Sequence, residues 1–101
     1  MLGARCYNSR VLSKALPASD LIESGIEDLE RGIESISALL VSIGAPRLRR
    51  LGLRVPEAVI ESPEHRLYEL LRQVEPDAAH ARYNALVRRL VSFERAVECA
   101  R

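Results

Sequence analysis

Several residue types are scarce in this sequence, and each scarcity limits what the chain can be. Its 101 residues include no tryptophan, one phenylalanine, one methionine and a single lysine, Lys14, beside fourteen arginines. Leucine, isoleucine, valine and alanine must therefore form the core, and with 48% apolar residues a chain of this length can bury one as a single domain. The preference for arginine over lysine indicates a G+C-rich genome or a hot habitat, where ion pairs are enriched.

Cysteine is too scarce to form a structural framework. The two cysteines, Cys6 and Cys99, have no second cysteine or histidine at ligand spacing nearby, which excludes a zinc framework and a redox pair. We expect both to be small buried or surface residues. A disulfide that joins the two ends of the chain stays open as an alternative, because intracellular proteins of hyperthermophiles carry disulfides.

Long hydrophobic runs and an excess of one charge are missing as well. No run of about eighteen apolar residues occurs, so we expect no membrane-spanning helix and a cytoplasmic protein. The formal net charge of +1 gives no overall attraction to nucleic acid or to an anionic membrane, so such binding would need a local patch. Residues 1–18 contain basic residues and no acid, which predicts a short basic segment within one domain that covers residues 1–101.

The motifs of catalysis and cofactor binding are also absent. No glycine-rich phosphate loop occurs, and no serine has a histidine and an aspartate in a recognisable catalytic setting. His65 and Glu69 could present two metal ligands from one helical face, but the carboxylate metal sites of helical bundles need Glu-x-x-His on two helices, and the sequence has no such motif. We therefore expect no enzyme, no metal site, no cofactor and no small-molecule substrate.

An apolar heptad pattern dominates the first half of the chain. Between Asp20 and Gly44, seven apolar residues recur at intervals of 4-3-4-3-4-3, as on one face of a helix. Pro17 precedes the pattern, and Gly44 with Pro46 follows it, which predicts a single helix over about residues 19–43. This first seam consists of Ile22, Ile26, Leu29, Ile33, Ile36, Leu40 and Ile43.

Two glycines, Gly25 and Gly32, lie inside this predicted helix, and each costs about 1 kcal/mol relative to alanine. They represent either a tolerated loss or a place where a neighbouring helix approaches closely.

A second seam with the same spacing predicts a final helix over about residues 77–100. It consists of Ala79, Tyr83, Leu86, Leu90, Phe93, Val97 and Ala100. The equal length of the two seams indicates that the two long helices pack on each other. Further apolar residues flank both seams, which favours a bundle over a two-stranded coiled coil.

Prolines divide the middle of the chain into short pieces. Pro63 begins a predicted helix over 63–75, in which Leu67, Leu70, Leu71 and Val74 share one face. Short turns are expected from Pro46 and from Pro56. The predicted fold is thus an all-α bundle of two long helices, one shorter helix and proline-bracketed turns.

Flanking charges do not decide how the two long helices are oriented. The connection between them favours an antiparallel pair, with a tight hairpin between the helix over 63–75 and the last helix. Whether the seams pair within one chain or between two chains stays open. The central seam residues Ile33 and Leu90 are expected to be buried, each losing about 2–5 kcal/mol of stability on truncation to alanine.

Residues 46–54, PRLRRLGLR, concentrate positive charge, with four arginines and no acid in nine residues. Two further arginines in the last helix can add to it. Because arginine binds phosphate oxygens in a bidentate manner, this set is a candidate contact for nucleic acid or for an acidic partner. The set is Arg47, Arg49, Arg50, Arg54, Arg88 and Arg89.

A structural interpretation competes with this one, because the arginines can pair with the acids of the first helix. Aromatic platforms for single-stranded nucleic acid are missing, so backbone contact would be the mode of binding. The sequence therefore predicts a non-enzymatic helical module for protein–protein interaction, which forms a homo-oligomer or is a subunit of an assembly. A nucleic-acid-binding accessory protein is the alternative.

Overall fold

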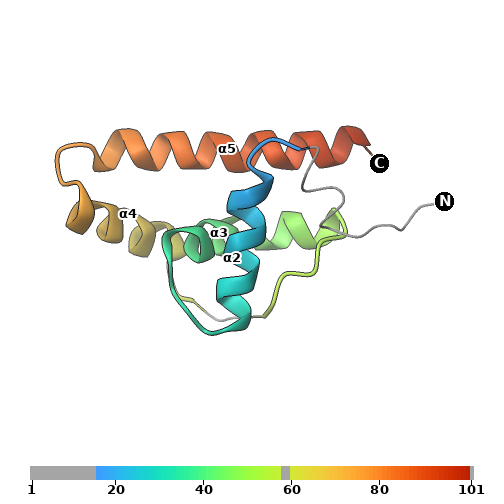
Figure 1. Cartoon of the computed structure of the whole chain (residues 1–101), viewed down its shortest axis with the longest axis horizontal. Helices are drawn as coiled ribbons and strands as arrows, with labels where there is room; N and C mark the ends of the chain where they lie inside the picture. Colours follow the sequence, from blue (N-terminus) through green and yellow to red (C-terminus); the bar gives the residue numbers. More distant parts are fainter. Residues whose placement is uncertain (1–15, 58–59, 101) are drawn as a thin grey trace.

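The structure, a computed structural model, describes residues 16–57 and 60–100, and every regular element within them is an α-helix (Figure 1). The helices are α2 (Ser19–Glu30), α3 (Ile36–Arg50), α4 (Pro63–Val74) and α5 (Ala79–Ala100). This confirms the predicted all-α class. Most of the basic segment predicted over 1–18, including Cys6, lies outside the described residues. No helix of the described chain has both the length and the apolar character needed to cross a membrane.

The predicted single helix over 19–43 is wrong, because the chain breaks between α2 and α3. Gly32 adopts a left-handed conformation with φ 74°, and the N–H groups of Gly32 and Ile33 bond back to the carbonyls of Leu29 and Asp28. These two bonds form a Schellman motif, which ends a helix. Ser35 then begins α3, because its Oγ accepts a hydrogen bond from the Ala38 N–H at 3.1 Å.

The break changes the position of Ile33 in the fold. Its side chain is 47% exposed, so the expectation that Ile33 is a central core residue is wrong. The other seam residues whose burial the structure describes are buried or partly buried. Those buried are Ile22, Leu29, Leu40, Ala79, Leu86, Leu90, Phe93 and Val97, and those partly buried are Ile26, Ile36, Ile43 and Tyr83.

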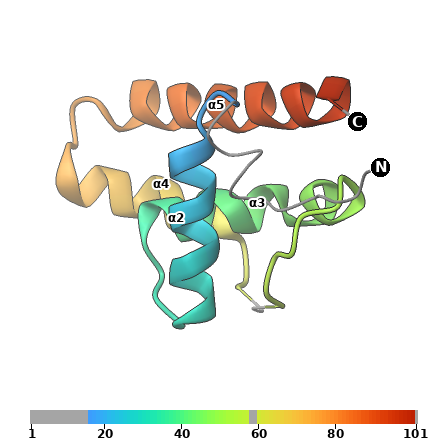
Figure 2. The same cartoon turned by 45° about the vertical axis from the view of Figure 1, so that its right-hand side comes forward.

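After the break, α2 lies steeply across α3 (Figures 1 and 2). A Cβ atom on Gly25 would lie 2.3 Å from the Ser37 carbonyl oxygen and 2.5 Å from Cγ2 of Val41. The close approach of a neighbouring helix is therefore confirmed at Gly25. It is wrong for Gly32, where a Cβ would meet nothing within 4 Å and the glycine serves the turn instead.

Helix α3 continues through Gly44 and Pro46, so the predicted helix end and the predicted turn from Pro46 are wrong. Proline removes a single backbone hydrogen bond from the helix. The helix persists because Ala45 and Leu48 are buried on its inner face. The turn expected from Pro56 includes residues 58–59, which lie outside the described residues.

The other two predicted helices are confirmed as α4 and α5. Tyr68 of α4 and Tyr83 of α5 make an edge-to-face ring contact with centroids 5.9 Å apart, and Glu75 forms an ion pair with Arg82 at 3.8 Å. The two helices therefore form the expected hairpin. The predicted apolar face of α4 is wrong at one residue, because Val74 is 63% exposed.

The antiparallel pairing expected for the first and last long helices is wrong for α3, the half of the predicted helix that packs on α5. Gly44 lies against Leu90, and Arg47 further along α3 faces Glu94 and Glu98 further along α5. The two helices thus run in the same direction. Figure 1 shows α4 beside the first half of α5 and α3 beside the second half. The described residues thus form four helices, where two long helices and one shorter helix were predicted.

Truncation of the two central seam residues is expected to have unequal effects. Leu90→Ala should lower the free energy of unfolding by about 2–5 kcal/mol, because its side chain is 3% exposed at the α3–α5 contact. Ile33→Ala should lower it by less than about 1 kcal/mol, because about half of its side chain is already in water. Urea unfolding of both variants measures the difference, and equal losses would contradict this packing.

Candidate functional site

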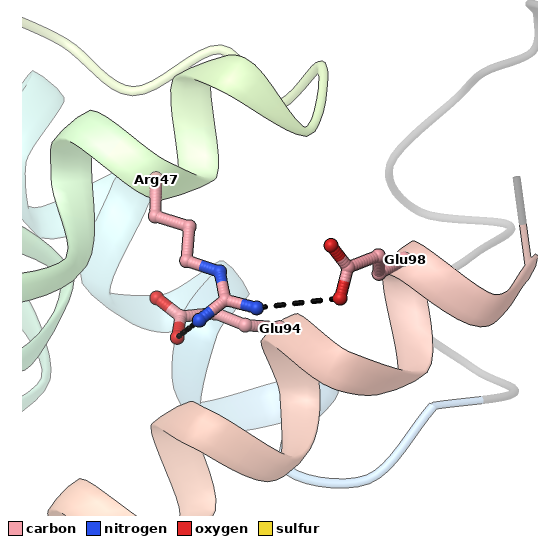
Figure 3. Close-up of polar contacts among 3 residues, drawn as sticks. All are labelled: Arg47, Glu94 and Glu98. Atoms are coloured by element: carbon pink, nitrogen blue, oxygen red, sulfur yellow. Dashed lines mark hydrogen bonds and ion pairs between the residues drawn. The ribbon is translucent and has the colours of Figure 1, made fainter.

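The six arginines predicted as one set lie in different environments and do not form a single cluster. Arg47 turns toward α5, where its guanidinium lies 3.7 Å from Oε1 of Glu94 and 3.4 Å from Oε1 of Glu98 (Figure 3). The structural interpretation had assigned these arginines to the acids of the first helix. For Arg47 that partner is wrong, because the acids come from the last helix.

Arg49 stabilises the segment that follows α3. Its Nε donates a hydrogen bond to the carbonyl of Val55 at 3.2 Å, and its Nη2 donates to the carbonyl of Pro56 at 2.9 Å. The guanidinium therefore satisfies two backbone acceptors that no helix or strand satisfies. Arg50 is exposed and also has an interaction partner.

The remaining members of the set lie at the surface. Arg54, Arg88 and Arg89 are exposed and form no hydrogen bond or ion pair with any described residue. Arg95, which the sequence analysis did not single out, is exposed on the same helix as Arg88 and one heptad further along. A helical projection of α5 would have identified it, because Arg88 and Arg95 share the side opposite Leu90.

The most unusual polar group of the described chain is Glu94, which sequence reasoning missed. Glu94 is only 5% exposed, although it carries a carboxyl group, and it directly follows the buried Phe93. Space for the carboxylate exists because Gly44 has no side chain, since a Cβ there would lie 2.9 Å from Oε2 of Glu94. The cluster of Arg47, Glu94 and Glu98 thus joins the second half of α3 to the second half of α5 (Figure 3).

The surroundings of Glu94 favour its protonated form. Burial raises the pKa of this carboxyl above the usual glutamate value, and the positive charge of Arg47 opposes the rise without cancelling it. Arg47 also contacts the exposed carboxylate of Glu98, so its charge is shared between two acids. The cluster can therefore take up a proton at Glu94 without losing the contact between Arg47 and Glu98.

A second polar group surrounds an open surface pocket beside α4. Arg66 forms an ion pair and hydrogen bonds with Glu34, and His65 lies 3.9 Å from Glu69 one turn away. Leu39 and Leu70 contribute the apolar part of the lining. The pocket thus combines an apolar surface with charges of both signs.

The described residues contain no cluster of side chains suited to bind a metal ion. They contain no group of three or more His, Cys, Asp or Glu side chains that could hold a metal ion. His65 has one carboxylate neighbour, and Nε2 of His80 lies within hydrogen-bonding distance of the Asn84 amide at 3.2 Å. Cys99 is exposed with a free thiol.

Comparison of the chain with known protein families, with curated proteins and with solved structures found no significant match.

Protonation of Glu94 predicts a specific pH dependence of stability. Because its pKa is higher in the folded state than in the unfolded chain, its favourable contribution is complete in acid and is lost as the pH rises through the folded-state value. Glu94→Gln resembles the protonated side chain, so this variant should be more stable than the wild type at neutral pH. The advantage should vanish in acid below the usual glutamate pKa.

The control is Glu98→Gln, which removes the exposed carboxylate of the same cluster. Its effect should be small over the whole pH range, because exposed ion pairs contribute about 0–1 kcal/mol. Urea unfolding at several pH values measures both variants. A Glu94→Gln protein that is less stable than the wild type at neutral pH would show that the ion pair with Arg47 outweighs the burial of charge.

Proposed function

We propose that this chain is a non-enzymatic helical module that acts by associating with proteins, first of all with a second copy of itself. The main support is the exposure of two large apolar residues, Ile33 at 47% between α2 and α3 and Val74 at 63% at the end of α4. Each of these side chains would be stabilised by burial against a partner, because removing apolar surface from water contributes about 25 cal/mol per Å². We expect the module to act in the cytoplasm.

The shape of the described chain also supports a role in assembly. It is elongated, with extents of 46 × 24 × 18 Å, and α2 crosses its middle (Figure 2). The open pocket beside α4 adds Leu39 and Leu70 next to charges of both signs. Mixed charges around apolar groups suit a protein surface, which presents both kinds of group, better than they suit a polyanion.

Most of the arginines of residues 46–54 have partners within the chain, which favours protein association over nucleic-acid binding as the proposed function. Arg47 contacts two acids, Arg49 donates hydrogen bonds to two carbonyls, and Arg50 also has an interaction partner. Three of the four arginines of residues 46–54 thus have interactions already. A phosphate would have to displace these contacts. Protein association requires no such displacement.

Self-association is expected to depend on the two exposed apolar residues. The wild type should dimerise in the micromolar range, and Ile33→Ser or Val74→Ser should each weaken the dimer by about a hundredfold, because each removes roughly 1–2 kcal/mol of apolar burial from each of the two chains. Ala85→Ser, at an exposed position of α5, is the control and should leave the dimer unchanged. Sedimentation equilibrium gives the masses, and a monomer at every concentration would contradict the proposal.

Nucleic-acid binding through the phosphate backbone is the second candidate, and the outward side of α5 favours it. Arg88, Arg89 and Arg95 are exposed there, and Arg88 and Arg89 have no acid beside them in sequence between His80 and Phe93. Such a surface would bind without sequence preference and with a steep dependence on salt, because arginines that neutralise phosphates release counterions.

If this candidate is correct, replacing Arg88 and Arg89 together with glutamine should weaken binding to all duplex sequences alike. The slope of log affinity against log salt should flatten by about two units, since each phosphate contact contributes about −0.9. Arg49→Gln is the matched control, because it should lower the free energy of unfolding by about 1 kcal/mol through lost bonds to Val55 and Pro56 without changing that slope. Fluorescence anisotropy at several salt concentrations measures the affinity, and its absence in low salt would exclude this function.

A further inference from the structure

We propose that α2 exchanges between two copies of this chain. In the exchanged form the segment 31–35 becomes helical, so that α2 and α3 join into one helix, and each α2 packs on α3 of the second copy. The contact is the one that α2 makes within a single chain in the structure. This inference rests on the proposed self-association and gives it a mechanism.

The first support is the phase of the apolar seam across the break. Leu29, Ile33 and Ile36 keep the intervals of four and three, although the helix is interrupted between the first and the last of them. The apolar pattern of this segment therefore also fits one continuous amphipathic helix. In a continuous helix Ile33 would lie in line with its neighbours in the seam, instead of being 47% exposed.

The second support is the small set of contacts that hold the break. The break between α2 and α3 depends on the left-handed Gly32, on the Ser35 cap of α3, and on the hydrogen bond from Ser35 to the Asp28 carboxylate at 2.6 Å. Helical backbone bonds through residues 31–35 would replace the first two. The ion pair between Glu34 and Arg66 also ties the segment to α4, but it is exposed and therefore weak.

The third support is the packing of α2, which lies chiefly on α3 (Figures 1 and 2). Its exchange therefore breaks essentially one interface and restores the same interface in the second copy, which is why domain swapping is a low-cost route to a dimer. Residues 16–18 precede α2 directly and move with it.

Geometry requires that the exchanged α2 finds a second copy. Gly25 and Ser37 are in direct contact when the chain is bent. In a continuous helix these two residues would be separated by about 18 Å along the axis, at 1.5 Å per residue. The apolar side of α2 would then be uncovered, and α3 of another chain offers the one surface already shown to fit it. The two Ile33 side chains would lie near the symmetry axis of such a dimer, where they can cover each other.

The test is Gly32→Ala, which disfavours the left-handed conformation and favours the helix. Both effects act in each of two chains, so the dissociation constant of the dimer should fall by about a hundredfold. Gly52→Ala is the matched control, because Gly52 also has a positive φ, 101°, and is exposed, but follows α3 away from the segment that straightens. Its dissociation constant should equal that of the wild type.

Isotope-filtered NMR on mixed labelled and unlabelled chains, refolded together, shows where α2 packs. In the exchanged dimer, the α protons of Gly25 in one chain give a nuclear Overhauser effect to a methyl group of Val41 in the other. A dimer that lacks this intermolecular signal overturns the exchange but leaves the proposed self-association standing. A Gly32→Ala protein that dimerises no more tightly than Gly52→Ala overturns the exchange as well.

A second variant keeps the test decisive if Gly32→Ala does not fold, which circular dichroism would show. Ser35→Ala removes the cap of α3 and the bond to Asp28 without changing the glycine. It should also tighten the dimer and give the same intermolecular signal. A folded Ser35→Ala protein whose dimer is no tighter than that of the wild type overturns the exchange.

Discussion

The fold depends on how closely α3 can be approached, because each of the other described helices packs on it. Glycine permits the approach on two sides. At Gly25 an added methyl group would collide with the backbone oxygen of Ser37, which cannot move without the helix. At Gly44 it would meet the ends of the Leu90 and Glu94 side chains, which can rotate away. The crossing of α2 over α3 is therefore the more rigid of the two contacts, and the contact with α5 is the more adaptable.

The contact between α3 and α5 contains the buried carboxyl group of Glu94, and this group favours the parallel orientation of the two helices. If α5 were reversed with Gly44 still opposite Leu90, Arg47 would lie near Leu86 and Val87, and Glu94 would lose its counterion. A buried carboxylate without a partner is far more costly than the loss of a surface pair. The Arg47–Glu94 pair therefore contributes more to the orientation of α5 than to the total stability, since the raised pKa of Glu94 shows that burial outweighs the attraction.

The sequence predicted the helical class, α4 and α5, because Pro63 and Pro76 delimit regular apolar patterns. The break after α2 was missed because the heptad continues through it in phase, although Gly32 and Ser35 carry the ordinary signals of a helix end and a helix start. The end of α3 was missed because burial of Leu48 outweighed Pro46. For the site, the arginines were identified but their partners were not, since Glu98 lies 51 residues from Arg47 and meets it only through parallel packing.

The distribution of charge favours the proposed self-association over the proposed binding of nucleic acid. Acids gather on α2, where Asp20, Glu27 and Glu30 are exposed, whereas the outward side of α5 presents Arg88, Arg89 and Arg95. The chain as a whole has a formal charge of +1. A polyanion attracted to α5 would be repelled by the acids of α2, and beyond a Debye length of about 8–10 Å both interactions are largely screened. A second copy presents both signs, so complementary faces can attract each other without that repulsion.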